Sequence, residues 1–396
     1  MAGNVIIITH VFPNHLEPTG GLFNKYQIEE AGKFCCIKVI APLPWFPGIS
    51  VLGKRAEFSY AGRVQRKEMI GNIPVYHPLY FAIPKIGRFL HGFFYFFSII
   101  LLCQRLHKEN SIEAIVSMYG YPDAFAGSLV ALFLRKPHII KLLGSDVNII
   151  SRKFLRGKFI RFALRRADEI IVMSDDMKEK VVELGVNSSK LTTLYNGVDK
   201  TIFKPISQDS ARRKLGIEGE DMVVLFVGNF KRIKGIDFLL EAAKKLKADF
   251  PKLKFFLVGQ GPLEYSYKNF VKKNRLDKTV KFLGVKTPEE IAMLMNGADI
   301  LCLPSLNEGL PNVVLESISC GTPVIASNVG GIAEVICSDE SGFLIKPGNT
   351  DSLVNALKRG LTKEWDRKEI FKRSSDFSWV RNAEGLYEII KKTSKR

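Results

Sequence analysis

The sequence predicts an α/β protein with two doubly wound parallel-sheet domains that face a cleft, and a C-terminal helix that crosses back to the first domain. Short runs of Val, Ile, Leu and Phe alternate with segments of helical periodicity along the whole chain. Such nearly continuous apolar runs are typical of parallel strands that helices cover on both faces. The runs are too numerous for one open sheet. The alternation of strand and helix patterns is interrupted once, by a polar stretch at residues 196–221.

The expected elements follow this rhythm in order. In the first half, strands are expected at residues 5–9, 38–42, 75–80, 114–118, 139–143, 169–173 and 191–195, and helices at 22–34, 122–134 and 176–184. In the second half, strands are expected at 223–228, 255–259, 280–283, 300–304, 324–326 and 342–345, and helices at 236–247, 263–274, 288–296, 311–319 and 351–359. We therefore expect two Rossmann-like domains, residues 1–200 and 201–378, and a final segment, 379–396, whose helix at 380–392 follows an anchoring Trp379. Ligands of such sheets bind at the carboxyl ends of the strands, so the cleft is the expected site.

Composition and charge narrow the classes of function. The chain has 396 residues, of which 46% are hydrophobic and 25% charged, a balance that excludes collagen-like, low-complexity and largely disordered proteins. Its 58 Lys and Arg against 40 Asp and Glu give a net charge of +18. Such a charge favours anionic partners: nucleotides, phosphate esters, nucleic acid or an anionic membrane face.

Cysteine and histidine patterns indicate neither a disulfide framework nor a metal centre. The six cysteines include no C-x-x-C pair, and the six histidines have no metal-ligand spacing. We expect buried, reduced thiols of a cytoplasmic protein, and no metal ion or other cofactor. A basic region and a cleavage site are missing before the first strand, so we expect no signal peptide.

Two segments bear on membrane association. Residues 89–103 are apolar, but they are 15 residues against the ~20 of a spanning helix, so we expect a buried helix or one lying on a bilayer surface. The run Arg152–Arg166 has seven basic residues and no acidic one, with Phe and Leu at helical spacing. Two interpretations stay open for it. It is either an ordinary surface helix of its domain or a contact with an anionic membrane or acceptor.

The most informative motif carries two glutamates around a helix start. After the strand at 300–304, Glu308 lies in a loop, Pro311 begins a helix, and Glu316 lies five residues further, ~7–8 Å along the helix axis. The free N–H groups of the first turn form an anion site between the two carboxylates. Carboxylates accept hydrogen bonds from vicinal hydroxyls. The spacing therefore fits a sugar nucleotide, in which a diphosphate joins a sugar to a ribose.

Two glycine-containing loops add to this motif. Gly228 ends a strand and is followed by Lys231, Arg232 and Lys234, cations that could compensate a leaving diphosphate. Gly20-Gly21 follows the first strand and opens a helix, which suits a loop close to a phosphate. Each glycine pair alone is a weak signal, because a structural turn has the same sequence.

Together these residues resemble a known family. Glu308 and Glu316 with seven residues between them, the segments 327–336 and 342–348, Asn196-Gly-Val-Asp199 and Gly228 with Lys234-Gly235 resemble family 4 retaining glycosyltransferases. The resemblance covers the whole chain and is densest in residues 222–350. In the first half, Gly20-Gly21-Leu-Phe, residues 41–47 and residues 144–148 are similar to members that build bacterial surface polysaccharides.

The resemblance implies a GT-B fold and a nucleotide-diphosphate sugar donor bound by the second domain. It implies that Glu316 binds the ribose, that Glu308 holds hydroxyls of the donor sugar, and that Lys234 neutralises the diphosphate. The backbone around residues 282–285, with Val285, would contact the base. The donor site would further include Gly228, Asn229, Arg232, Gly309 and Leu310.

For the first domain, the resemblance implies that Gly20 and Gly21 close over the phosphates and that Ser145 and Asp146 lie on the acceptor side. The implied activity is retaining transfer of a hexose-type sugar to a glycan or lipid-linked acceptor, in the cytoplasm and peripherally on the inner membrane face. The chain departs from the family at Asn229, where Arg is frequent, and at Leu143, where His or Arg is frequent. Lys231, Arg232 or Lys234 must then supply the positive charge that an Arg at position 229 would bring. His10 or His15 could replace the histidine that is missing at position 143.

The absence of a D-x-D motif predicts transfer without a divalent metal.

Two other functions remain open. A sugar-nucleotide epimerase also pairs two Rossmann-like domains, and it would turn over its sugar without an acceptor. A nucleic-acid-binding protein is suggested only by the charge of +18, and because the cations are scattered we expect no nucleic-acid partner.

Overall fold

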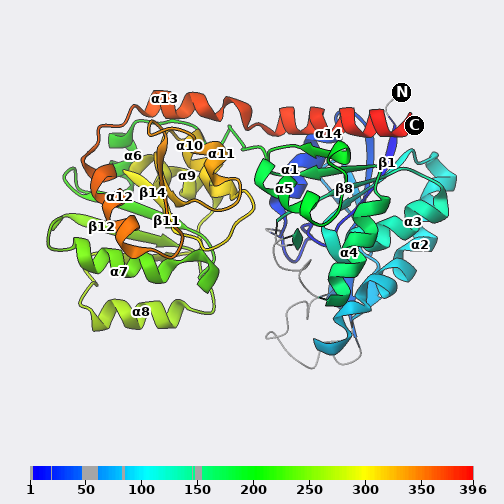
Figure 1. The fold of residues 1–396 in the computed structure, drawn as a ribbon, viewed down its shortest axis with the longest axis horizontal. Coiled ribbons are helices and arrows are strands. Elements are labelled where there is room, and N and C mark those ends of the chain that lie inside the picture. The colour runs from blue at the N-terminus through cyan, green and yellow to red at the C-terminus, as the bar shows by residue number, and fades with distance from the viewer. Residues whose placement is uncertain are drawn as a thin grey trace. The chain divides into compact units, whose positions relative to one another are not determined.

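The computed structural model describes residues 3–18, 20–46, 61–82, 85–144, 146–147 and 154–395. The chain divides into two compact units. Unit 1 joins Met1–Asn196 with Trp379–Arg396, and unit 2 is Gly197–Ser378. Each unit is built around one mainly parallel sheet (Figure 1).

The sheet of unit 1 has eight strands in the order β10-β9-β8-β7-β1-β2-β5-β4. Its neighbours are parallel except β4, which is antiparallel to β5 at the edge. A small parallel sheet joins β3 to β6. The strands are Asn4–Ile8 (β1), Cys36–Ile40 (β2), Leu43–Trp45 (β3), Lys67–Ile70 (β4), Ile73–Tyr76 (β5), Leu79–Phe81 (β6), Ala114–Met118 (β7), His138–Lys141 (β8), Glu169–Val172 (β9) and Leu191–Thr193 (β10).

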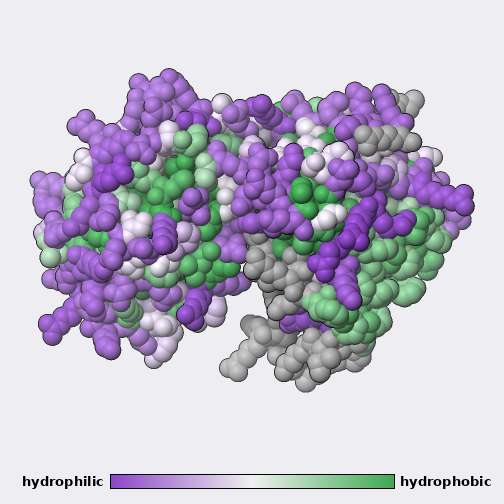
Figure 2. All heavy atoms as spheres, in the orientation of Figure 1, coloured by the Kyte–Doolittle hydropathy of each residue, from purple (hydrophilic) through white to green (hydrophobic). Residues whose placement is uncertain are grey.

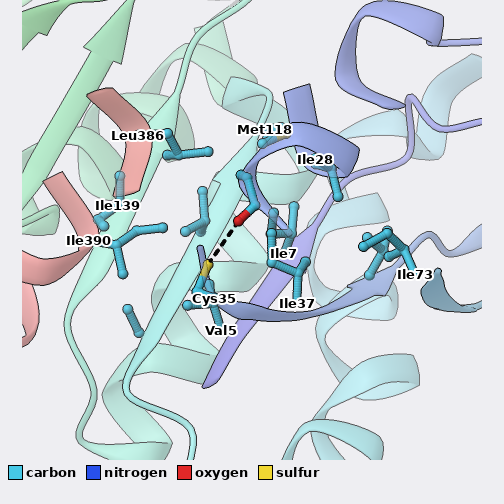
Figure 3. Close-up of a cluster of buried hydrophobic side chains, with 14 of the residues drawn as sticks. Val5, Ile7, Ile28, Cys35, Ile37, Ile73, Met118, Ile139, Leu386 and Ile390 are labelled. Atoms are coloured by element: carbon cyan, nitrogen blue, oxygen red, sulfur yellow. Dashed lines mark hydrogen bonds between the residues drawn. The ribbon is translucent and has the colours of Figure 1, made fainter. Parts of the chain in front are cut away.

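Helices cover both faces of this sheet, because successive side chains of a strand point to opposite faces. Val5 and Ile7 of β1 belong to a core with α1 and α14, whereas Ile6 and Ile8 belong to a core with α2 and α3. Leu386 of α14 lies in the first of these cores (Figure 3), which confirms the predicted return of the C-terminal helix to the first domain. The helices of unit 1 are Leu22–Ala31 (α1), His91–Asn110 (α2), Phe125–Leu134 (α3), Phe154–Arg166 (α4), Asp175–Glu183 (α5) and Trp379–Ser394 (α14).

The sheet of unit 2 has six parallel strands in the order β13-β12-β11-β14-β15-β16. The strands are Met222–Val227 (β11), Leu253–Val258 (β12), Val280–Gly284 (β13), Ile300–Leu303 (β14), Val324–Ser327 (β15) and Gly342–Ile345 (β16). The helices are Gln208–Leu215 (α6), Ile236–Leu246 (α7), Glu264–Lys273 (α8), Pro288–Gly297 (α9), Asn312–Ser319 (α10), Ile332–Val335 (α11), Thr350–Thr362 (α12) and Arg367–Lys372 (α13).

Local sequence signals fix several helix starts. The N-terminus of α9 is a capping box, in which Thr287 accepts from the N–H of Glu290 and Glu290 accepts from the N–H of Thr287. Pro288 occupies the first turn, where its missing N–H leaves no hydrogen bond unmade.

The predicted α/β class with two parallel-sheet domains is confirmed.

The elements differ from the predicted ones at a few places. The strand expected at residues 75–80 is two strands, β5 and β6, because the segment passes from the large sheet to the small one at His77-Pro78. The strand β4 was not expected, and α2 continues to Asn110 rather than ending with the apolar run. The segment Gly120–Ala124 before α3 is kinked, because Tyr121 within it has an extended backbone.

Candidate functional site

The strand order of unit 2 indicates where along the sheet a ligand is expected to bind. From β11 the chain continues to β12 on one side, whereas β14 pairs with β11 on the other side. The loops that leave β11 and β14 therefore diverge at the carboxyl edge of the sheet, and such a switch point is where doubly wound sheets bind ligands. The predicted cation loop follows β11, and the predicted glutamate loop follows β14.

These two loops meet through an ion pair. The Nζ atom of Lys234 lies 2.6 Å from Oε1 of Glu308. The hydroxyl of Ser305 donates to the same oxygen at 2.7 Å. The N–H of Leu306 donates to the carbonyl of Ile233 at 2.8 Å, so the backbones are joined as well. The side chains of Lys234 and Glu308 are 22% and 11% exposed, so the pair is accessible to a ligand without being freely solvated.

Two glycines allow these loops to approach so closely. Gly235 has a φ of +68°, and a Cβ atom there would lie 1.9 Å from the carbonyl oxygen of Pro304. Gly330 has a φ of +58°, and a Cβ atom there would lie 2.3 Å from the carbonyl oxygen of Gly309. The N–H of Gly331 donates to that carbonyl at 2.7 Å. The loop after β15 thus supports the glutamate loop, and a larger side chain at either glycine would separate the loops.

Glu316 lies in the second turn of α10, behind the same loop. Its side chain is half-buried, and burial raises the pKa of the carboxyl to about 7. A half-buried carboxyl with a raised pKa suits a ligand that brings its own hydroxyl donors.

The other predicted donor residues lie around the same edge. Gly228 and Asn229 directly follow β11, Arg232 begins the turn before Lys234, and Val285 follows β13 with 64% of its side chain exposed. Gly309 lies in the glutamate loop. Leu310 follows it in the same loop with a side chain that is only 4% exposed, and its predicted role stays a prediction.

The predicted residues of the first domain have different outcomes. Gly20 and Gly21 lie between β1 and α1 in unit 1, and Gly21 has a φ of +70°. Their predicted contact with the donor stays a prediction, as does the predicted role of Ser145, which lies outside the described residues.

Asp146 has a structural role in unit 1. Its side chain is fully buried, and its carboxylate accepts hydrogen bonds from the N–H groups of Gly120, Leu143, Gly144 and Val147. Burial raises the pKa of Asp146, although these four hydrogen bonds act to lower it. Asp146 therefore shapes this loop, and its predicted place on the acceptor side stays a prediction.

Unit 1 contains a further polar cluster at the carboxyl edge of β1. Nδ1 of His10 lies 2.6 Å from Oδ2 of the buried Asp123, and the N–H of His10 donates to Oδ1 at 3.1 Å. The hydroxyl of Tyr95 donates to the same Oδ1 at 2.5 Å. Burial acts to lower the pKa of His10, but the charge and hydrogen bond of Asp123, helped by the charge of Asp146, raise it overall. The sequence offered His10 as a candidate, but no signal in it linked His10 to Asp123.

Within residues 3–395, apart from the undescribed gaps, no group of three or more His, Cys, Asp and Glu side chains is placed to hold a metal ion.

Comparison with known proteins agrees with this geometry. Residues 207–376 match the family model described as glycosyl transferases group 1, and residues 58–201 match the model of glycosyltransferase family 4. An uncharacterised glycosyltransferase of Methanocaldococcus jannaschii is 31% identical over 79% of this chain and 84% of its own length. The chain belongs to glycosyltransferase family 4. A putative teichuronic acid biosynthesis glycosyltransferase of Bacillus subtilis is 27% identical to this family member over 98% of the chain and 99% of the relative.

Solved structures show that this family 4 glycosyltransferase has the GT-B fold. A sucrose-phosphate synthase of Thermosynechococcus elongatus matches with a TM-score of 0.76 and 20% identity, over 98% of both chains. The HepE protein of Anabaena, solved with UDP and glucose, matches with a TM-score of 0.72 and 19% identity, over 98% of this chain and 100% of the neighbour.

Proposed function

We propose that this family 4 glycosyltransferase moves a hexose-type sugar from a nucleotide-diphosphate donor to a glycan or lipid-linked acceptor with retention of configuration. The observation that carries the proposal is the Lys234–Glu308 ion pair at the switch point of unit 2, with Glu316 behind it. The carboxylate of Glu308 matches the sugar of such a donor, the cation of Lys234 matches its diphosphate, and the carboxylate of Glu316 matches its ribose. The solved neighbour with UDP and glucose supports a uridine diphosphate sugar as the first donor to test.

Each residue has a distinct role in this proposal. Glu308 accepts hydrogen bonds from hydroxyls of the donor sugar, and Ser305 and Lys234 hold its carboxylate in place. Lys234 compensates the charge that develops on the leaving diphosphate, as do the N-terminal amides of α10. Glu316 accepts from the ribose hydroxyls. Retention follows from attack on the face from which the diphosphate leaves.

We propose that this transfer needs no divalent metal, because the chain has no D-x-D motif and a lysine is available for charge compensation. Full activity in excess EDTA is expected. Loss of activity that magnesium or manganese restores would contradict this part of the proposal.

The cellular role and location are proposed on separate grounds. Similarity to the putative teichuronic acid biosynthesis enzyme along nearly the whole chain supports a role in cell-surface polysaccharide synthesis. We propose that the enzyme acts in the cytoplasm, peripherally on the inner membrane face, where a lipid-linked acceptor would be displayed.

A donor screen tests the proposed function. The chain is heated with a panel of uridine, guanosine and adenosine diphosphate sugars, and a donor is expected to raise the unfolding temperature because it binds only the folded state. The donor that does so is then incubated with acceptors, and release of the nucleotide is measured. Glu308→Ala is expected to abolish transfer and to leave the far-UV circular dichroism unchanged, whereas Lys231→Ala, in the facing loop, is expected to transfer at a rate within a few fold of the parent. Normal transfer by Glu308→Ala, or sugar turnover that needs no acceptor, would contradict the proposal.

A further inference from the structure

The helices α2, α3 and α4 of unit 1 each expose large apolar side chains. On α2, Phe97 and Leu101 are 68% and 74% exposed, and they lie one turn apart on the side opposite the buried residues of the helix. Figure 2 shows apolar atoms over the region of α2 and α3, with strongly hydrophilic side chains beside them. The further exposed apolar residues are Leu132 and Phe133 of α3, and Phe154, Leu155 and Phe162 of α4.

Aromatic contacts join the three helices. The ring of Phe125 at the start of α3 lies 5.0 Å from Phe93 of α2 and 4.7 Å from Phe159 of α4. Phe93 and Phe159 also meet, with ring centroids 5.6 Å apart. These rings pack the three helices against one another. The outer surface that α2, α3 and α4 present is here called the α2–α4 face.

The same packing decides how α2 could meet a bilayer. Residues Gly87–Asn110 are long and apolar enough to cross a membrane by length and composition alone. However, Tyr95, Ile99 and Cys103 are fully buried in the core between α2 and the sheet. A spanning α2 would remove these side chains from the core of unit 1. The folded protein therefore offers a lipid phase one side of the helix, with the helix lying in the plane of the surface.

The charge on the α2–α4 face has one dominant sign. Between Phe154 and Arg166 the helix α4 has five basic residues and no acidic one. Nζ of Lys158 lies 4.3 Å from the ring centroid of Phe154, and the guanidinium of Arg166 lies 5.7 Å from that of Phe162. Cations thus stand directly beside exposed aromatic rings. The α3 helix is followed by two more cations, Arg135 and Lys136.

We propose that the α2–α4 face docks unit 1 on an anionic lipid bilayer, with Phe97, Leu101 and Phe154 entering the acyl boundary and Lys158 and Arg165 contacting the headgroup phosphates. A polyanion such as nucleic acid would use the cations but would leave the rings of Phe97 and Leu101 in water. An anionic bilayer uses both, because each basic residue gains from the surface potential and each apolar side chain leaves water. The inference rests on the proposed function only for the purpose of docking, which is to bring the enzyme to a lipid-linked acceptor.

Vesicle binding tests the proposal without any sugar. The purified full chain is sedimented with vesicles of phosphatidylcholine alone and with vesicles that contain 30% phosphatidylglycerol, at low and high salt. We expect binding to the phosphatidylglycerol vesicles, weakened by salt, and little binding to phosphatidylcholine alone. Equal binding to both vesicles, or a chain that stays in the supernatant at low salt, would overturn the proposal.

Matched variants separate the two parts of the face. Phe97→Ser with Leu101→Ser is expected to weaken vesicle binding about 100-fold, because two apolar side chains lose their burial in lipid. Lys158→Glu with Arg165→Glu is expected to weaken it at least tenfold and to reduce its salt dependence. The controls lie in unit 2 on α8: Tyr265→Ser, at a side chain 79% exposed, and Lys272→Glu with Lys273→Glu, which are expected to bind as the parent does. If the control variants lose as much binding as the α2–α4 variants, the proposal is wrong.

A fluorescence measurement locates the contact. Phe97→Trp is expected to gain blue-shifted emission on adding anionic vesicles and to be quenched by brominated acyl chains. Phe97→Trp emission that vesicles leave unchanged would place α2 outside the lipid and overturn the proposal. The outcomes also distinguish this inference from the proposed function. Transfer to a soluble acceptor without vesicle binding refutes the docking surface alone, and vesicle binding without recognition of any nucleotide sugar refutes the proposed function alone.

Discussion

Lys234 and Glu308 follow two different strands of the unit 2 sheet, yet their charged groups lie 2.6 Å apart. Since β11 and β14 are neighbours, the loops that follow them meet at one point of the carboxyl edge. The two side chains neutralise one another in the ligand-free protein. Under the proposed function, a diphosphate that approaches Lys234 would compete with Glu308, and a sugar that donates hydrogen bonds to Glu308 would release the lysine for the phosphates.

Substitution of the cations should show which one compensates the diphosphate. We expect Lys234→Ala to lower kcat by about 100- to 1000-fold, the usual loss when one preorganised charge at the leaving group is removed. The exposed neighbours Lys231 and Arg232 have no comparable contact with Glu308, so Lys231→Ala and Arg232→Ala should each lower kcat by less than about tenfold. Steady-state release of the nucleotide is the measurement. Equal losses for the three variants would mean that the loop acts as a diffuse positive charge.

The pKa of Glu316, raised by burial from 4.5 to about 7, predicts a pH dependence of stability. Below pH 4.5 the folded and the unfolded chain both hold the proton. Between pH 4.5 and about 7 the unfolded chain releases it while the folded chain keeps it, so the free energy of unfolding falls as the pH rises. Glu316→Gln removes this titration. The stability of the variant relative to the parent should therefore rise by up to about 3 kcal/mol between pH 4 and pH 8. Urea unfolding at the two pH values measures it, and a difference that does not change with pH would show that Glu316 is well solvated.

Donor binding should release the proton of Glu316. If ribose hydroxyls donate to its carboxylate, the ligand stabilises the ionised form and lowers the pKa of Glu316. Titration calorimetry at pH 6.5 in buffers of different ionisation enthalpy should then show net proton release on binding of the donor sugar nucleotide. Glu316→Gln should bind with no such release. Proton release that persists in the variant would have to come from another group.

His10 predicts a stability change of the opposite sign. Its pKa is raised in the folded protein, so its contribution is fully present below the unfolded value of 6.5 and is lost as the pH rises through the folded pKa. We expect His10→Gln to destabilise the protein more at pH 5.5 than at pH 9. In Asp123→Asn, the NMR titration of the His10 ring should move to lower pH. An unchanged titration would mean that the 2.6 Å contact does not set the charge of His10.

The α14 helix allows a matched test of packing. Leu386 is fully buried between α14 and the sheet of unit 1, whereas Val380 on the same helix is 49% exposed. We expect Leu386→Ala to lower the free energy of unfolding by about 2–5 kcal/mol, and Val380→Ala to change it by less than about 0.5 kcal/mol. Urea unfolding followed by far-UV circular dichroism measures both. Similar small losses would contradict a structural role of α14 in unit 1.

The strands that the sequence predicted correctly are the buried parallel ones, because burial on both faces makes them apolar throughout. The strand β4, Lys67–Ile70, was missed since it pairs antiparallel at a sheet edge, where a Lys and a Glu are tolerated. The second half of α2 was missed for a related reason. Its residues 104–110 are mostly polar, and the expected helix was defined by the apolar run alone.

For the site, the sequence supplied the residues but not their contacts. The ion pair of Lys234 with Glu308 depends on the pairing of β11 with β14. Neither loop sequence predicts that these two strands are neighbours. Asp146 also has contacts that the sequence did not supply. The resemblance implied a place on the acceptor side, which stays a prediction, and gave no sign that four backbone N–H groups would donate to its carboxylate. Partners that lie far along the chain, such as Asp123 for His10, leave no local pattern to find.

Unit 1 is made of two segments of the chain, one before and one after unit 2. This arrangement has a consequence for biosynthesis. During translation, residues 4–196 emerge first, but Ala383, Leu386 and Ile390, which close their core, are made only after all of unit 2. The nascent first half must wait on the ribosome with part of one side of its sheet uncovered, while unit 2, which is continuous, can fold as soon as it has emerged. Slow elongation through residues 197–378 would prolong that exposure and give chaperones their longest opportunity to bind.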